Sequence, residues 1–140
     1  MCLKQKNNTI KKGRSLLHRG KYNQAINLYK KGFEKVNNDL KYNIYNGLGN
    51  CYRCLKEYNK AIKYYKKAIK NKPKDAPGGL YWSNISFCYA QFRKWDKAIE
   101  AAKKALSLLK KEEATGIKHG NQLKILDLEI KLYKEYKKRD

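Results

Sequence analysis

The sequence predicts an all-α protein in which antiparallel helical hairpins stack into a solenoid. Three segments resemble one another: YNQAINLYKKG at residues 22–32, YNKAIKYYKKA at residues 58–68 and WDKAIEAAKKA at residues 95–105. They begin 36 and 37 residues apart, and a repeat of about that length is typical of stacked helical hairpins. Apolar residues at steps of three and four precede each segment, which is the spacing of one helical face. The chain therefore predicts three hairpins.

The first helix of each hairpin is expected just before its repeated segment. Its large apolar residues are Ile10, Leu16 and Leu17 in the first hairpin, Tyr45, Leu48 and Tyr52 in the second, and Trp82, Ile85 and Tyr89 in the third. Gly13, Gly49 and Ser86 share one position, where the lack of bulk lets the paired helix come close. Thr9 and Lys12 occupy positions that are apolar in the other hairpins, so we expect a frayed or irregular opening helix.

Two breaks separate the hairpins, and a further helix follows the third. Asn37, Asn38 and Asp39 mark a short break, whereas residues 72–79 (KPKDAPGG) form a longer one. Residues 117–138 predict a capping helix, because a terminal hairpin cannot bury its apolar face alone. Its buried stripe is expected to contain Leu123, Leu126, Ile130 and Tyr133, widened by Ile125, Leu128 and Leu132. The alternative is an amphipathic helix lying on a membrane surface.

Residues 42–75 resemble the tetratricopeptide repeat family. Residues at the family's positions are Tyr45, Leu48, Gly49 and Tyr52 in the first helix, Tyr58, Ala61, Tyr65 and Ala68 in the second, and Pro73 after it. Residues 79–112 keep most of the pattern but have Ala102 where an aromatic is usual, and residues 6–39 match least. The length of 140 residues and the hydrophobic content of 41% predict a single domain over residues 1–140. The resemblance implies repeats at 6–39, 42–75 and 79–112 in a right-handed superhelix.

The net charge of +22 would attract acidic proteins, nucleic acid or anionic membranes. The basic residues are spread from Lys4 to Arg139, in a chain that is also rich in Asn, Ile and Tyr. We interpret the charge chiefly as a solvated surface of biased composition. An acidic partner is compatible with it, but the charge alone names no ligand.

The sequence predicts a soluble, cytoplasmic protein. No apolar run approaches the roughly 20 residues that span a bilayer, and no secretory signal follows Met1. Residues 1–33 contain no acidic residue, which leaves mitochondrial import as an alternative.

The four cysteines are expected to be buried free thiols in a reducing compartment. Cys51 and Cys54 form a C-x-x-C pair, but Cys2 and Cys88 do not supply the second close pair that a structural zinc site needs. We therefore predict no metal site.

The sequence offers no catalytic constellation, so we predict that the protein is not an enzyme and has no cofactor. Gly47 and Gly49 lie in a helical pattern rather than after a strand, which excludes a phosphate-binding loop. His18 and His119 have no carboxylate or nucleophile at a recognisable spacing.

The resemblance implies that the first helices line a concave groove that receives an extended peptide or a partner helix. The residues expected to face it are Lys11, Arg14 and His18 in the first repeat, Asn43, Asn46, Asn50 and Arg53 in the second, and Ser83, Asn84, Phe87 and Gln91 in the third. Asn50 and Asn84 match positions where family members hydrogen-bond a peptide backbone, so their amides are expected to be spare in the free protein. Gly47 is expected to leave a gap in the groove wall.

Two functions follow from this surface. The first is a protein-binding adaptor or assembly subunit, although Ile10 and Asn46 stand where the family's carboxylate clamp would have lysines. The alternative is a basic helical repeat that binds RNA or DNA through phosphates. The lysines lie mostly on the second helices and the aromatics at packing positions, where they are poorly placed to stack on bases.

Overall fold

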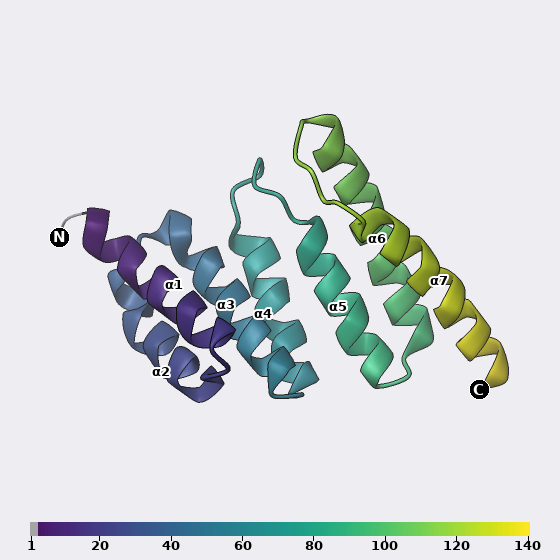
Figure 1. Ribbon diagram of the computed structural model, residues 1–140, viewed down its shortest axis with the longest axis horizontal. Helices are drawn as coiled ribbons and strands as arrows, with labels where there is room; N and C mark the ends of the chain where they lie inside the picture. Colours follow the sequence, from purple (N-terminus) through teal and green to yellow (C-terminus); the bar gives the residue numbers. More distant parts are fainter. Residues whose placement is uncertain (1–2) are drawn as a thin grey trace. The chain divides into compact units, whose positions relative to one another are not determined.

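The computed structural model describes residues 3–140, with side chains from residue 8 onward, and shows seven α-helices joined by turns and two 3-10 helices (Figure 1). Contacts divide the chain into two compact units, Met1–Lys74 and Asp75–Asp140. No strand occurs among residues 3–140. The predicted all-α class is therefore confirmed, and the single domain over residues 1–140 stays a prediction.

The first unit contains two hairpins. Helix α1 (Leu3–His18) pairs with α2 (Tyr22–Gly32), and α3 (Lys41–Cys54) pairs with α4 (Tyr58–Asn71). The short 3-10 helices η1 (Phe33–Lys35) and η2 (Asn38–Leu40) join α2 to α3, at the short break expected from the sequence.

The expected irregularity of the opening helix is wrong, because α1 is one continuous helix from residue 3 to residue 18. The side chain of Thr9 fills the space above Gly32 of α2, so this polar residue takes part in the packing. Lys12 is exposed and needs no apolar neighbour.

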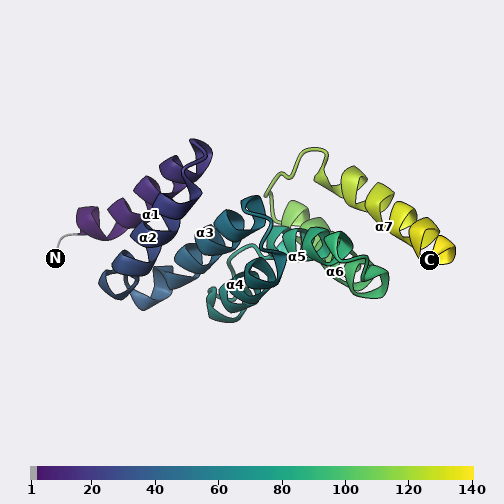
Figure 2. The same cartoon turned by 90° about the horizontal axis from the view of Figure 1, so that it is seen from below.

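The second unit contains one hairpin and a further helix. Helix α5 (Gly79–Gln91) pairs with α6 (Trp95–Ala114), and α7 (Gln122–Arg139) packs on α6. Residues 115–121 arch between α6 and α7 (Figure 2). Helix α4 ends at Asn71 and α5 begins at Gly79, which confirms the longer break.

The turn inside each hairpin has the same conformation. Gly20, Lys56 and Arg93 lie at equivalent positions and have φ angles of +74°, +60° and +56°. The next N–H in each turn donates to the carbonyl oxygen five residues earlier, from Lys21 to Leu16, Glu57 to Tyr52 and Lys94 to Tyr89, at 2.8–3.1 Å. This arrangement is a Schellman motif. The left-handed conformation costs a residue other than glycine about 1 to 2 kcal/mol of conformational free energy. Lys56 and Arg93 adopt it at this cost.

A tyrosine on the second helix packs against a glycine on the first helix in both hairpins of the first unit. A Cβ on Gly49 would lie 2.8 Å from Cδ1 and Cε1 of Tyr65, closer than carbon atoms can pack. Tyr29 occupies the corresponding space at Gly13, and its ring also fills the space at Gly47 of α3. Tyr29 therefore joins three helices, and burial raises its pKa to about 12.

The third hairpin replaces this contact with another. Ser86 takes the glycine position, and its buried hydroxyl donates to the Ala98 carbonyl oxygen at 2.7 Å. Ala102, which replaces the expected aromatic, is fully buried and packs in the core between α6 and α7. Tyr133 of α7 is buried near Ser86, and burial raises its pKa to about 12 while a hydrogen bond with Ser86 acts in the opposite direction. The aromatic ring absent from α6 is thus supplied by α7.

Helix α7 caps the second unit along one stripe only. Leu126, Ile130 and Tyr133 are buried, as expected. Ile125, Leu128 and Leu132 are 44, 64 and 46% exposed, so the prediction that they widen the buried stripe is wrong. A helix that packs against one neighbour covers one face, and these three side chains project from a different face of α7.

Glu112 joins the end of α6 to the start of α5. Its Oε1 atom accepts hydrogen bonds from the N–H groups of Gly78 and Gly79 at 2.8 and 2.9 Å, where a helix favours negative charge. Its Oε2 atom lies 2.8 Å from His119 Nε2, and both side chains are nearly buried. The expectation that no carboxylate lies near His119 is wrong, because the loop after α6 folds back onto that helix.

Replacement of Gly49 by Leu is expected to destabilise the protein by about 1 to 3 kcal/mol or more, because the added side chain collides with the Tyr65 ring. Urea denaturation measures the change. Lys63→Leu, at an exposed position of α4, is the control and should stay within about 0.5 kcal/mol of the parent protein. Equal stability of the two variants would contradict the Tyr65–Gly49 contact.

Replacement of Glu112 by Ala should lower the free energy of unfolding by about 1.5 to 3 kcal/mol, because two charge-assisted hydrogen bonds are lost. The neighbouring Glu113 is exposed, and Glu113→Ala removes the same charge without removing these bonds. Similar losses in the two variants would show that net charge, rather than the anchoring of Gly78 and Gly79, determines the effect.

Candidate functional site

The side chains expected in the groove of the first unit lie in rows on two helices that contact each other, α1 and α3. Lys11, Arg14 and His18 follow one exposed row of α1. Asn43, Asn46, Asn50 and Arg53 follow a half-buried row of α3. The Tyr29 ring, which packs on both helices through Gly13 and Gly47, holds the two rows beside each other.

Gly47 leaves no gap in this surface. It is buried, and the Tyr29 ring occupies the space that a side chain at residue 47 would take. The expected opening for a partner's apolar side chain is therefore wrong. The glycine is needed for close packing between α2 and α3.

The amide of Asn50 is not spare in the free protein, so that expectation is wrong. The Tyr65 hydroxyl donates to Asn50 Oδ1 at 2.7 Å, and Arg53 Nε donates to the Tyr65 hydroxyl oxygen at 3.1 Å. A side chain of α4 thus connects two residues of the α3 row. Asn50 contributes to packing between α3 and α4 as well as to the surface.

Three asparagines of the two units keep unused hydrogen-bonding groups. Asn43, Asn46 and Asn84 are half-buried, and none of them makes a side-chain hydrogen bond with another residue in the described part of the chain. Asn46 Oδ1 is shielded from solvent and unpaired, which is costly for a polar atom. Each amide offers both a donor and an acceptor.

The row of the second unit lies on α5 and extends to α7. Ser83, Asn84 and Phe87 are half-buried, and Gln91 is exposed. Gln122, the first residue of α7, donates from Nε2 to Ser83 Oγ at 3.1 Å. Sequence reasoning missed Gln122, because only the fold of residues 115–121 brings it to α5.

Aromatic rings and lysines interleave on α3 and α4. Tyr45, Tyr52 and Tyr64 stack with centroid distances of 5.4 and 6.3 Å. The ammonium groups of Lys30, Lys60 and Lys67 lie 5.3–5.9 Å from the centroids of these rings. Such cation–π contacts stabilise a surface that carries many like charges. They also cover ring faces on which a nucleic-acid base would stack.

Two of the cysteines are buried and one is exposed. Cys51 and Cys88 are buried thiols, and burial raises the pKa of the Cys51 thiol to about 12. Cys54 is exposed, so the expectation of burial is wrong for it, because the last turn of α3 faces solvent there. Cys2 lies outside the described residues.

Across residues 3–140 no three His, Cys, Asp or Glu side chains gather closely enough to hold a metal ion. In the same part of the chain, no helix combines the length and the apolar character that crossing a bilayer requires. The predicted compartment stays a prediction.

Comparison with known proteins supports the fold. Residues 42–75 match the tetratricopeptide repeat family, and no curated protein matches the sequence. A chain of a T3SS complex from Aeromonas hydrophila is similar in structure, with a TM-score of 0.83 and 15% identity over 99% of this chain and 87% of that one. The Hsp90 co-chaperone Cns1 from Saccharomyces cerevisiae has a TM-score of 0.69 and 24% identity, and the match covers 97% of this chain but only 43% of Cns1. The expected resemblance is therefore confirmed.

The Asn50→Ala variant should lose about 0.5 to 1.5 kcal/mol of stability, because the Tyr65 hydroxyl loses its acceptor. Thermal or urea denaturation measures this loss. Asn43→Ala, in the same row of α3, removes an amide with no hydrogen-bond partner among the described residues and should be nearly neutral. Equal losses would contradict the structural role of Asn50.

Proposed function

We propose that this chain, in which residues 42–75 form a tetratricopeptide repeat, is a protein-binding adaptor or assembly subunit. It acts by binding rather than by catalysis. The rows on α1 and α3 of the first unit hold an extended peptide or a helix of a partner protein. The observation that carries this proposal is the pair of half-buried amides at Asn43 and Asn46, with which no other described residue forms a hydrogen bond.

A bound peptide would use these amides. An extended backbone presents N–H and C=O groups at regular intervals, and an asparagine side chain can accept from one and donate to the other. The unpaired Oδ1 of Asn46 would gain a donor, which removes the cost of leaving it unsatisfied. The neighbouring exposed row of Lys11, Arg14 and His18 would add favourable contacts to acidic side chains of the partner.

The similar structures are consistent with a binding role. One belongs to a multi-protein T3SS complex and the other to an Hsp90 co-chaperone, so this helical fold occurs in proteins that work with other proteins. The fold alone does not select the partner.

One observation favours the nucleic-acid alternative, and another opposes it. Lysines and aromatic rings do interleave on α3 and α4, which is the pattern of single-strand binding. However, Tyr52 is buried and its ring, like those of Tyr45 and Tyr64, has a lysine ammonium above it. We therefore favour a protein partner.

The test is affinity purification of the tagged chain from its native cell, followed by quantitative mass spectrometry and a direct affinity measurement with the protein retained. The double variant Asn43→Ala and Asn46→Ala should weaken that affinity about fivefold or more, because each lost hydrogen bond contributes about 0.5 to 1.5 kcal/mol. The matched control replaces Asn23 and Asn27, exposed residues of α2, by Ala and should bind normally.

Two results would contradict the proposal. If nuclease treatment abolishes retention, the bound molecule is a nucleic acid. If Lys63→Ala with Lys66→Ala on α4 abolishes binding while the α3 variant does not, the binding surface lies on the second helices instead.

A further inference from the structure

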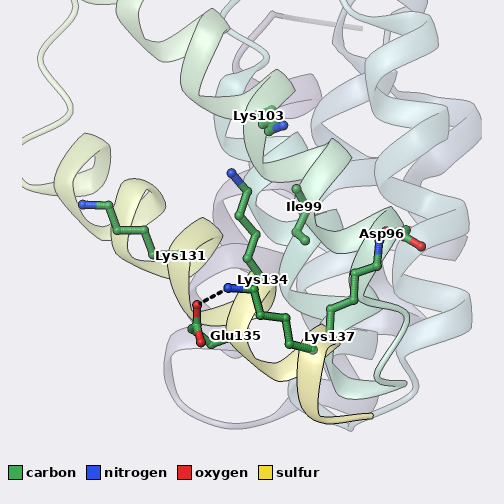
Figure 3. A pocket seen from close by; sticks show the side chains of 8 residues that line it. Asp96, Ile99, Lys103, Lys131, Lys134, Glu135 and Lys137 are labelled. Atoms are coloured by element: carbon green, nitrogen blue, oxygen red, sulfur yellow. Dashed lines mark hydrogen bonds and ion pairs between the residues drawn. The ribbon is translucent and has the colours of Figure 1, made fainter.

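A cavity of about 760 Å³ opens between α6 and α7 within the second unit (Figure 3). The lining residues are Asp96, Ile99, Lys103, Lys131, Lys134, Glu135, Lys137 and Lys138. Five of these eight are lysines and two are acidic. Lys103 projects from α6, and Lys131 and Lys134 project from α7 (Figure 3). The cavity shares no residue with the rows of polar residues on α1, α3 and α5.

The two carboxylates are already engaged by two of the lysines. Lys137 Nζ lies 2.5 Å from Asp96 Oδ1, and Lys138 Nζ lies 3.0 Å from Glu135 Oε1. Lys103, Lys131 and Lys134 are exposed and have no carboxylate partner among residues 3–140. The five lysines and two carboxylates that line the cavity therefore give it a net positive charge.

The two lysines of α7 repel each other in the absence of a ligand. Lys131 and Lys134 are three residues apart on one helix, a spacing at which like charges repel, and Asp127 and Glu135, each four residues from Lys131, offset part of this repulsion. Lys103 is in the middle of α6, where it gains nothing from a helix end. An anion bound among the three would remove this repulsion, which gives the free energy of binding a source that is built into the fold.

The cavity is also suited to more than an isolated anion. Its volume falls in the range of about 300 to 1,000 Å³ typical of sites that hold molecules larger than a single phosphate. Half-buried Ile99 contributes an apolar contact, and the aliphatic stems of the lysines add to it. Lysine ammoniums are flexible point charges, so they recognise clustered carboxylates without requiring one geometry.

We propose that this cavity binds an acidic segment of a partner protein, in which carboxylates contact Lys103, Lys131 and Lys134 while an aliphatic residue contacts Ile99. The proposal deepens the proposed adaptor function, on which the identity of the ligand as a protein rests. It adds a second contact surface outside the groove.

An acidic peptide fits the lining better than a nucleic acid does. No aromatic ring lines the cavity, so bases would find no stacking surface. Asp96 and Glu135 also line the cavity, and they would repel an unbroken row of phosphates more than a peptide in which uncharged residues separate the carboxylates. The same carboxylates can accept hydrogen bonds from peptide N–H groups.

The test is fluorescence anisotropy of the full chain with a labelled synthetic peptide in which Glu and Leu alternate, at about 0.15 M salt. The variant Lys103→Gln, Lys131→Gln and Lys134→Gln should bind the peptide about tenfold or more weakly, because three close charge contacts are lost. The matched control, Lys63→Gln, Lys66→Gln and Lys70→Gln on exposed positions of α4, removes the same charge and should change the affinity less than about twofold.

Several outcomes would overturn the proposal: no binding to the parent chain, equal loss in both triple variants, or unchanged binding of a peptide with Gln in place of Glu. Tighter binding of a single-stranded RNA that depends on the same three lysines would assign the cavity to nucleic acid. The Asn43→Ala and Asn46→Ala variant should bind the peptide normally. A failure at the cavity is therefore distinguishable from a failure of the proposed groove.

Discussion

The ring of Tyr65 occupies the space where a side chain at residue 49 would lie, and the packing of α3 on α4 depends on that contact. Tyr29 makes the equivalent contact with Gly13 and extends it to Gly47 of the next hairpin. A large flat ring against bare backbone lets two helices approach closely while excluding water. The rows of polar residues on α1 and α3 lie beside each other because this packing fixes the two helices.

The chain has a net charge of +22, and contacts between neighbouring side chains reduce the repulsion among its lysines. Lysines on α2 and α4 lie over tyrosine rings, and those near the end of α7 pair with Asp96 and Glu135. Exposed ion pairs contribute little individually, so these contacts chiefly limit repulsion. The lysines of the α6–α7 cavity that have no carboxylate partner among the described residues are then the informative ones, because the fold brings them to one cavity.

The third hairpin shows how the repeat tolerates departures from its own pattern. Ser86 is larger than the glycine at its position in the other hairpins, and Ala102 is smaller than the tyrosine at its position. Tyr133 of α7 provides the missing aromatic ring. Glu112 adds a second link, since it anchors the start of α5 from the end of α6. Helix α7 is thus part of the core of its unit, while its face with Leu128 stays exposed.

The sequence by itself determined the helical hairpins, the breaks between them and the close contacts at Gly13 and Gly49, because helical periodicity and repeated small residues are local properties of the chain. Only the tertiary structure decided which polar groups are engaged. Asn50 accepts a hydrogen bond from Tyr65 of the paired helix, and His119 of the loop after α6 contacts Glu112. No spacing in the sequence encodes these contacts. The same holds for the lysine cavity, since Lys103 of α6 and Lys134 of α7 line one cavity only when α7 packs on α6.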